Sequence, residues 1–68
     1  MPEAADYAIR LSWSERDAEC VATCAELPWL SGLGPTPAHA TAELRIAIGA
    51  WLEYLVAHGL PVPSPHDA

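Results

Sequence analysis

Few side chains in this 68-residue sequence could carry chemistry: three histidines, two cysteines and nine carboxylates. His39 and His58 stand at opposite ends of an expected helix, roughly 28 Å apart, so one subunit cannot bring them to a shared metal ion. Cys20 and Cys24 are expected on one strand, where their Cα atoms lie roughly 13 Å apart. A disulfide needs less than about 7 Å. We therefore expect free thiols, no metal site and no cofactor.

The carboxylates form no recognisable catalytic pattern. General acid–base catalysis needs carboxylates that converge on one point, but Glu15, Asp17 and Glu19 share a polar turn in which solvation is a sufficient explanation. Glu26 comes later, beside a loop where it could meet a partner. No serine stands next to a base, and no glycine-rich phosphate loop or zinc-ligand spacing occurs. We expect the chain not to be an enzyme.

Alternation of side chains predicts the strands that position these groups. Large apolar residues alternate with small or polar ones in the first segment, at Tyr7, Ile9, Leu11 and Trp13. A polar turn over residues 15–18 leads to a second alternating segment, residues 20–25. Closing that turn predicts a register that places each large residue opposite a small one on a shared face: Trp13 with Cys20, Leu11 with Ala22, and Ile9 with Cys24. We expect this face to be the core face of the sheet.

The second half of the sequence predicts a short strand and one long helix. A Leu27-Pro28-Trp29 hook precedes the third strand, at residues 30–33. Thr36 is the expected N-cap of a helix that continues to His58 and stops at Gly59. Residues 60–63 follow as a final edge strand or an extended tail, since two prolines interrupt them.

The expected helix is apolar on two sides. One stripe faces the sheet and consists of Ala40, Leu44, Ala47, Ile48, Trp51, Leu52 and Leu55. A second set lies beside it: Ala42, Ile46, Gly49, Ala50 and Tyr54. A helix that is apolar on two sides is usually covered on both, so we interpret the second set as an interface between subunits. The alternative is neutral drift at a tolerant surface.

Composition limits the classes of partner. The chain is one small domain with 51% hydrophobic residues, more than so small an interior can bury, which favours a homo-oligomer. Its net charge of −6 argues against direct nucleic-acid binding, because phosphate contacts need Arg and Lys. The charge favours a basic protein partner, or serves solubility alone. No apolar run reaches the length of a membrane span, and we expect a cytoplasmic protein.

Two stretches of the sequence resemble the HicB-like antitoxin domain family. They read W-S-E-R-D-A-E-C-V-A-T-C-A-E-L-P and G-P-T-P-A-H-A-T-A-E-L, and the resemblance spans residues 7–63, with a flexible lead-in over residues 1–6 and a flexible tail over residues 64–68. Ala18 stands where the family usually has a turn glycine, and Trp29 replaces another glycine. No DNA-binding segment follows the domain, so we expect no operator binding.

The resemblance implies an α+β fold of order βββαβ, a degenerate RNase H-like sheet with one long helix on one face. It also implies a function: such antitoxins neutralise HicA, a small RNA-cleaving toxin, by covering its surface. On this hypothesis Trp29 anchors the basic toxin, although packing at the core edge would explain Trp29 equally well. The carboxylates that would steer the toxin are Glu15, Asp17, Glu19 and Glu26. The alternative is an orphan homo-oligomeric scaffold or binding protein.

Overall fold

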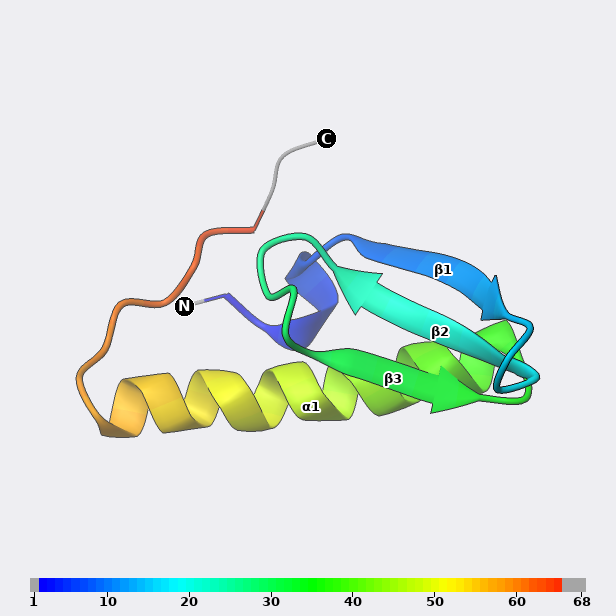
Figure 1. The fold of residues 1–68 in the computed structure, drawn as a ribbon. Helices are drawn as coiled ribbons and strands as arrows, with labels where there is room; N and C mark the ends of the chain where they lie inside the picture. The colour runs from blue at the N-terminus through cyan, green and yellow to red at the C-terminus, as the bar shows by residue number, and fades with distance from the viewer. Residues whose placement is uncertain (1, 66–68) are drawn as a thin grey trace.

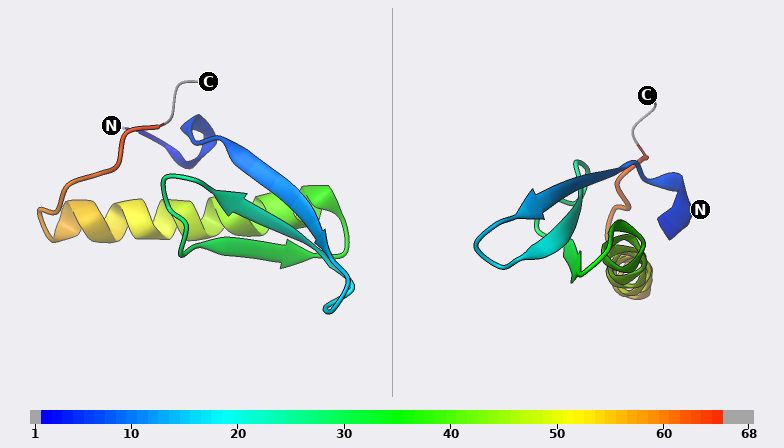
Figure 2. Two further views of the ribbon diagram at one scale, coloured as in Figure 1. Left: turned by 45° about the horizontal axis from the view of Figure 1, so that its top comes forward. Right: turned by 90° about the vertical axis from the view of Figure 1, so that its right-hand side faces the viewer.

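The computed structural model describes residues 2–65 and contains one three-stranded sheet and one long helix (Figure 1). The elements follow in the order η1 (Ala4–Asp6), β1 (Ile9–Ser14), β2 (Glu19–Cys24), β3 (Ser31–Gly34) and α1 (Pro37–Ala57). The sheet is antiparallel with strand order β1-β2-β3. Helix α1 runs along one face of it (Figure 2). The predicted α+β class, with three strands followed by one helix, is confirmed.

The register between β1 and β2 is the one that the alternating side chains predict. Trp13 lies opposite Cys20, Leu11 opposite Ala22, and Ile9 opposite Cys24. The hairpin turn requires a left-handed backbone at Ala18, with φ of 52°. An alanine in that conformation costs about 1–2 kcal/mol, because its Cβ approaches the following carbonyl oxygen.

Both ends of α1 are fixed by local hydrogen bonds. The Thr36 side chain accepts a bond of 3.1 Å from the His39 backbone N–H, as expected of an N-cap. At the other end the Leu60 N–H donates to the Leu55 carbonyl and the Gly59 N–H to the Val56 carbonyl, at 2.9 and 3.2 Å. This pair of bonds is a Schellman motif, with Gly59 in the left-handed region at φ of 63°.

The sheet and the helix meet backbone to backbone at β3. A Cβ atom on Gly32 would lie well under 3.0 Å from the Ala40 carbonyl oxygen and the Leu44 backbone nitrogen of α1. A Cβ atom on Gly34 would collide with the ring of His39. Because Gly32 and Gly34 have no side chain, α1 can lie directly against β3.

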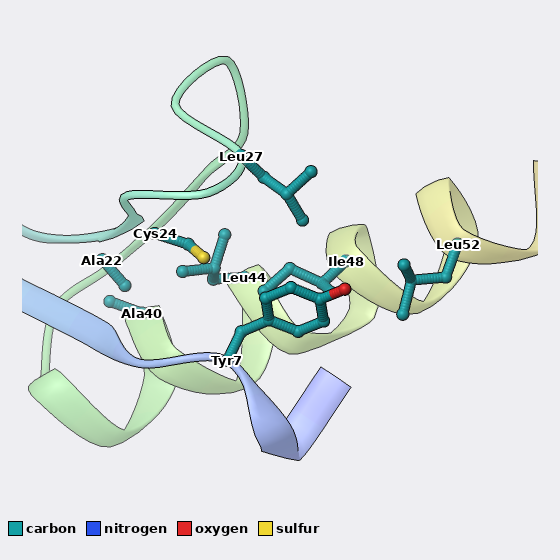
Figure 3. Packing of buried hydrophobic residues seen from close by; sticks show 8 residues of the cluster. All are labelled: Tyr7, Ala22, Cys24, Leu27, Ala40, Leu44, Ile48 and Leu52. Atoms are coloured by element: carbon teal, nitrogen blue, oxygen red, sulfur yellow. The ribbon is translucent and has the colours of Figure 1, made fainter. Parts of the chain in front are cut away.

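The core lies between α1, β2 and the loop that follows β2. Leu27, Leu44 and Ile48 are the largest fully buried side chains. Tyr7, which precedes β1, packs in the same cluster (Figure 3). The buried stripe of α1 repeats at the spacing expected for one helical face: Ala40, Leu44, Ile48, Leu52 and Leu55. The sequence prediction for this face is confirmed for these residues, whereas Ala47 and Trp51 are half-buried.

The predicted core face is wrong at the outer half of β1. Ile9 packs against the core, but Leu11 and Trp13 are 49% and 56% exposed. The helix is about 10 Å wide and strands are about 4.8 Å apart, so one helix covers only two strands. Because α1 lies against β3 and β2, the end of β1 remains uncovered.

The two ends of the domain also differ from expectation. Within residues 2–65 no fourth strand forms: residues 60–63 are extended without strand pairing, and Pro61 and Pro63 have no N–H to donate. The phenol of Tyr7 instead donates a hydrogen bond to the Pro63 carbonyl. The expected lead-in folds as η1, with Ala4 packed against the core. Residues 66–68 of the expected tail, and Met1, lie outside the described residues.

Replacement of Gly32 by alanine tests the contact between β3 and α1. Because the new Cβ meets backbone atoms that cannot rotate away, we expect Gly32→Ala to lower the free energy of unfolding by about 1–3 kcal/mol, as overpacked cores do. Gly49→Ala is the matched control, since no atom lies within 4 Å of a Cβ there. In a helix interior that change should stabilise the fold by about 0.5–1 kcal/mol. Urea denaturation measures both, and equal stability of the two variants would contradict the packing.

Replacement of Ala18 by glycine tests the hairpin turn. Glycine adopts the left-handed conformation without strain but has more freedom to lose on folding, so we expect a net gain of up to about 1 kcal/mol. Ala25→Gly is the control: Ala25 is also an exposed loop alanine, but its φ is not positive. That variant should lose stability. The idea fails if Ala18→Gly is the less stable of the two in thermal denaturation.

Candidate functional site

Trp29, predicted to bind a partner, and Tyr54, predicted to lie in a subunit interface, belong to one row of rings. Trp29 meets Trp51 edge to face at 5.7 Å between ring centroids, and Trp51 stacks on Tyr54 at 5.2 Å. Tyr54 in turn meets the His58 ring at 4.2 Å. We call Trp29, Trp51, Tyr54 and His58 the aromatic row. Trp29 and Tyr54 remain 58% and 45% exposed within it, so the row is an outer surface of the molecule.

Helical spacing and one buried leucine assemble the row. Trp51, Tyr54 and His58 are three and four residues apart on α1 and its C-cap, so they lie one above the other. Trp29 comes from the loop between β2 and β3. Leu27 fixes that loop, because its side chain is fully buried and the Leu27 N–H donates to the Cys24 carbonyl at 3.2 Å. The next turn, with a bond from the Leu30 N–H to the Leu27 carbonyl, carries Trp29 to Trp51.

A carboxylate lies in the same loop as Trp29. Glu26 accepts a hydrogen bond from the thiol of Cys24, with 3.4 Å between Sγ and Oε1. Burial is the main cause that raises the pKa of the Cys24 thiol above its ordinary value, so the thiol keeps its proton at neutral pH. The half-buried Glu26 thus presents negative charge three residues from Trp29.

Trp51 is the inner member of the row. Its indole Nε1 is shielded from solvent and has no hydrogen-bond partner among residues 2–65. An unpaired buried donor costs about 1–3 kcal/mol. The Trp51 ring contacts both Trp29 and Tyr54 and so lies between them in the row.

The structure separates the carboxylates that were predicted to bind one partner. Glu15, Asp17 and Glu19 lie in or beside the hairpin turn, whereas Glu26 follows the far end of β2, roughly 16 Å away along the strand. In the turn Ser14 and Asp17 share a hydrogen bond of 3.2 Å between their side chains. The hairpin carboxylates and Glu26 thus form two acidic regions near opposite ends of β2.

The predicted subunit interface lies on the outer side of α1. Ala42, Ile46 and Ala50 are exposed, and the exposed fraction of Ile46 reaches 68%. Gly49 is half-buried and meets nothing that would exclude a Cβ. Tyr54, the last member of this set, belongs to the aromatic row, so the proposed oligomer surface and the proposed partner surface are contiguous there.

Neither a metal-binding cluster nor a pocket is found among the described residues. Within residues 2–65 no three His, Cys, Asp or Glu side chains come together in a way that could hold a metal ion, and no pocket is found there. His39 faces Glu43 at 3.6 Å in the first turns of α1, and His58 contacts the Tyr54 carbonyl at its other end. In this same part of the chain no helix is long and apolar enough to cross a membrane.

Sequence reasoning missed Trp51 and His58 as members of the site. The spacing of residues 51, 54 and 58 was a usable signal, because such residues are neighbours on a helix. Local spacing could not reveal Trp29 as a neighbour of Trp51, because it comes from a loop more than twenty residues away. The buried Leu27 and the hydrogen bonds of that loop place Trp29 beside Trp51.

Comparison of the chain with protein-family models, with curated proteins and with solved structures finds no match in any of the three.

The buried phenol and thiol predict how stability depends on pH. Burial, and then the nearby acidic groups of Cys24 and Glu26, raise the pKa of Tyr7 above its ordinary 10.0. Above that pH the unfolded chain loses a proton that the folded chain keeps, so the free energy of unfolding falls as pH rises. The pKa of the Cys24 thiol is also raised, from its ordinary value of 9.0. Its titration therefore also lowers the free energy of unfolding as the pH rises.

Denaturation of Tyr7→Phe at a series of pH values separates the two groups. At neutral pH the variant should lose about 1 kcal/mol, because the bond to the Pro63 carbonyl is gone. Above pH 10.0 its stability should fall less steeply than that of the wild type. If the free energy of unfolding of Tyr7→Phe falls with pH as steeply as that of the wild type, Tyr7 has the same pKa in the folded and the unfolded chain.

Proposed function

We propose that this chain is a protein-binding domain of antitoxin type, which neutralises a small basic RNA-cleaving toxin by covering its surface. The observation that carries the proposal is the aromatic row, in which Trp29 and Tyr54 offer exposed rings from a rigid support. Tryptophan, tyrosine and arginine supply most binding hot spots in protein interfaces. An exposed pair of such rings in so small a domain supports binding to another protein.

Charge supports a basic partner for this surface. The chain carries a net charge of −6, and Glu26 lies in the same loop as Trp29. Arginine side chains stack on the faces of Trp and Tyr and pair with carboxylates. The hairpin carboxylates Glu15, Asp17 and Glu19, which lie farther away, would act through the long-range field that speeds encounter.

The resemblance to HicB-like domains supports the antitoxin assignment. The order of three antiparallel strands and one helix agrees with the first four elements of the fold that the resemblance implies. The left-handed residue of the hairpin is Ala18, the position at which the family usually has glycine. A degenerate RNase H-like ancestry and a cytoplasmic location belong to this same proposal.

A second candidate function is a homo-oligomeric scaffold. The exposed fraction of 68% at Ile46 favours it, together with the exposed Ala42 and Ala50 on the same side of α1. In an assembly held by this surface, a charge at residue 46 would be buried without a partner, and Ile46→Glu would dissociate the subunits.

The test mixes the purified chain with any small basic protein that a neighbouring gene encodes, with RNA cleavage as the readout. The wild-type chain should stop cleavage at stoichiometric concentration. Trp29→Ala should weaken inhibition by about 30-fold or more, the size of a hot-spot loss of 2 kcal/mol. Glu26→Lys should weaken it more at low salt than at high salt, because screening removes the charge term.

Trp13→Ala is the matched control for Trp29→Ala. Both tryptophans are exposed to nearly the same extent, 56% and 58%, but Trp13 lies on β1 outside the aromatic row. The control should inhibit as well as the wild type. Full inhibition by Trp29→Ala would remove the row from the proposal, and a wild-type chain that leaves cleavage unchanged would refute the antitoxin function for this partner.

A further inference from the structure

The outer edge of β1 is an open β-sheet edge. β1 is the first strand in the order β1-β2-β3, so one side of its backbone faces away from β2. Among the described residues, the backbone hydrogen bonds of residues 9–14 go to β2 alone. The unpaired N–H and C=O groups of such an edge form a template for another strand.

The side chains of β1 lack the features that usually protect an open edge. Natural edge strands carry inward-pointing charges, prolines or bulges. β1 reads Ile-Arg-Leu-Ser-Trp-Ser over six residues and pairs with β2 without a break in register. Its one charge, Arg10, lies on the face away from α1. On the face toward α1, Leu11 and Trp13 are about half exposed.

Residues 60–65 of the same chain do not pair with this edge. Residues 60–65 are extended without strand pairing, and the Pro63 carbonyl accepts its bond from Tyr7, two residues before β1 begins. Three prolines in these six residues remove the N–H donors that a ladder would need.

We propose that β1 pairs antiparallel with β1 of a second copy of this chain and thereby forms a continuous six-stranded sheet. Opposed residues in a sheet share a face, and a one-residue slip reverses every side chain. The apolar side chains of the two copies therefore share a face only if one residue of β1 lies opposite the same residue of the second copy. The two-fold axis then runs between these two equivalent residues, and we name it by that residue. The axis at Leu11 gives Leu11 opposite Leu11 of the second copy, and Ile9 opposite Trp13 of the second copy.

This register matches apolar with apolar and polar with polar. Arg10 then faces Ser12 of the second copy, so no like charges oppose each other. An axis at Arg10 would oppose two arginines, which is unfavourable. An axis at Ser12 would leave Ile9 opposite the hairpin residue Glu15. Of these registers, the one with its axis at Leu11 buries Ile9, Leu11 and Trp13 against one another.

Charge selects a second copy over a basic partner at this edge. β1 carries a single positive charge in a chain of net charge −6. A basic strand would meet the like charge of Arg10 there, whereas two acidic chains approach each other most easily along their least acidic strand. Both helices would lie on the same face of the joined sheet, and the pairing uses no residue of the aromatic row. The proposal is independent of the antitoxin function.

Sedimentation of the purified chain with single lysine substitutions tests the edge. The wild type should be a dimer and Leu11→Lys a monomer, because an inward lysine at the axis would face its own copy. Leu33→Lys is the matched control. Leu33 has a similar exposed fraction, 46% against 49%, but lies on β3 and on the opposite face of the sheet. Circular dichroism shows whether each variant is folded, and Leu33→Lys should remain dimeric.

Cysteine cross-linking tests the register. A residue on the axis faces itself, with about 4.5–5.5 Å between the two Cα atoms, which is within the range of a disulfide. In a Cys20→Ala background, Leu11→Cys should form a covalent dimer rapidly with an added oxidant such as diamide, and Leu33→Cys should not. Equal cross-linking of the two variants would overturn the register.

The remaining outcomes separate this interface from the others. A wild-type monomer at high concentration, or a Leu11→Lys dimer, overturns the proposal. A dimer that dissociates with Ile46→Glu but persists with Leu11→Lys assigns the interface to the outer side of α1 instead. Trp29→Ala should remain dimeric whatever its effect on toxin inhibition, so failure of one proposal is distinguishable from failure of the other.

Discussion

The close approach of β3 to α1 is the contact on which the other features of the domain depend. Gly32 has no side chain, so the backbone of β3 lies against the Ala40 carbonyl and the Leu44 backbone nitrogen. Only two residues, Pro35 and the N-cap Thr36, connect β3 to α1, which leaves the helix no other place to begin. Sheet and helix are thereby joined at their closest spacing, and Leu44 and Ile48 reach into the core.

That contact also determines what remains uncovered. A helix placed over β3 and β2 cannot reach the far end of β1, because one helix is only about two strands wide. Leu11 and Trp13 are therefore exposed beside the small residues Ala22 and Cys20, although their strand pairs in the expected register. The exposed apolar surface of β1 is a geometric consequence of the one-helix architecture.

The two proposed surfaces of the molecule have different chemistry. The aromatic row combines exposed rings with carboxylates and is held by the buried Leu27, which suits a basic protein. The edge of β1 offers backbone groups and apolar side chains with one positive charge, which suits a second copy of the chain. On both proposals, association would bury apolar surface that a small domain with 51% hydrophobic residues cannot bury in its own interior.

The sequence alone determined the features that depend on neighbours within a few residues. Alternation predicted the register of β1 and β2, and Thr36 and Gly59 marked the helix ends through their caps. Only the tertiary structure decided which strands the helix covers, that residues 60–63 form no strand, and that Trp29 meets Trp51. The reason is physical: these outcomes depend on contacts between segments distant in the chain, such as Gly32 with Leu44 and Leu27 with the core, which local periodicity does not encode.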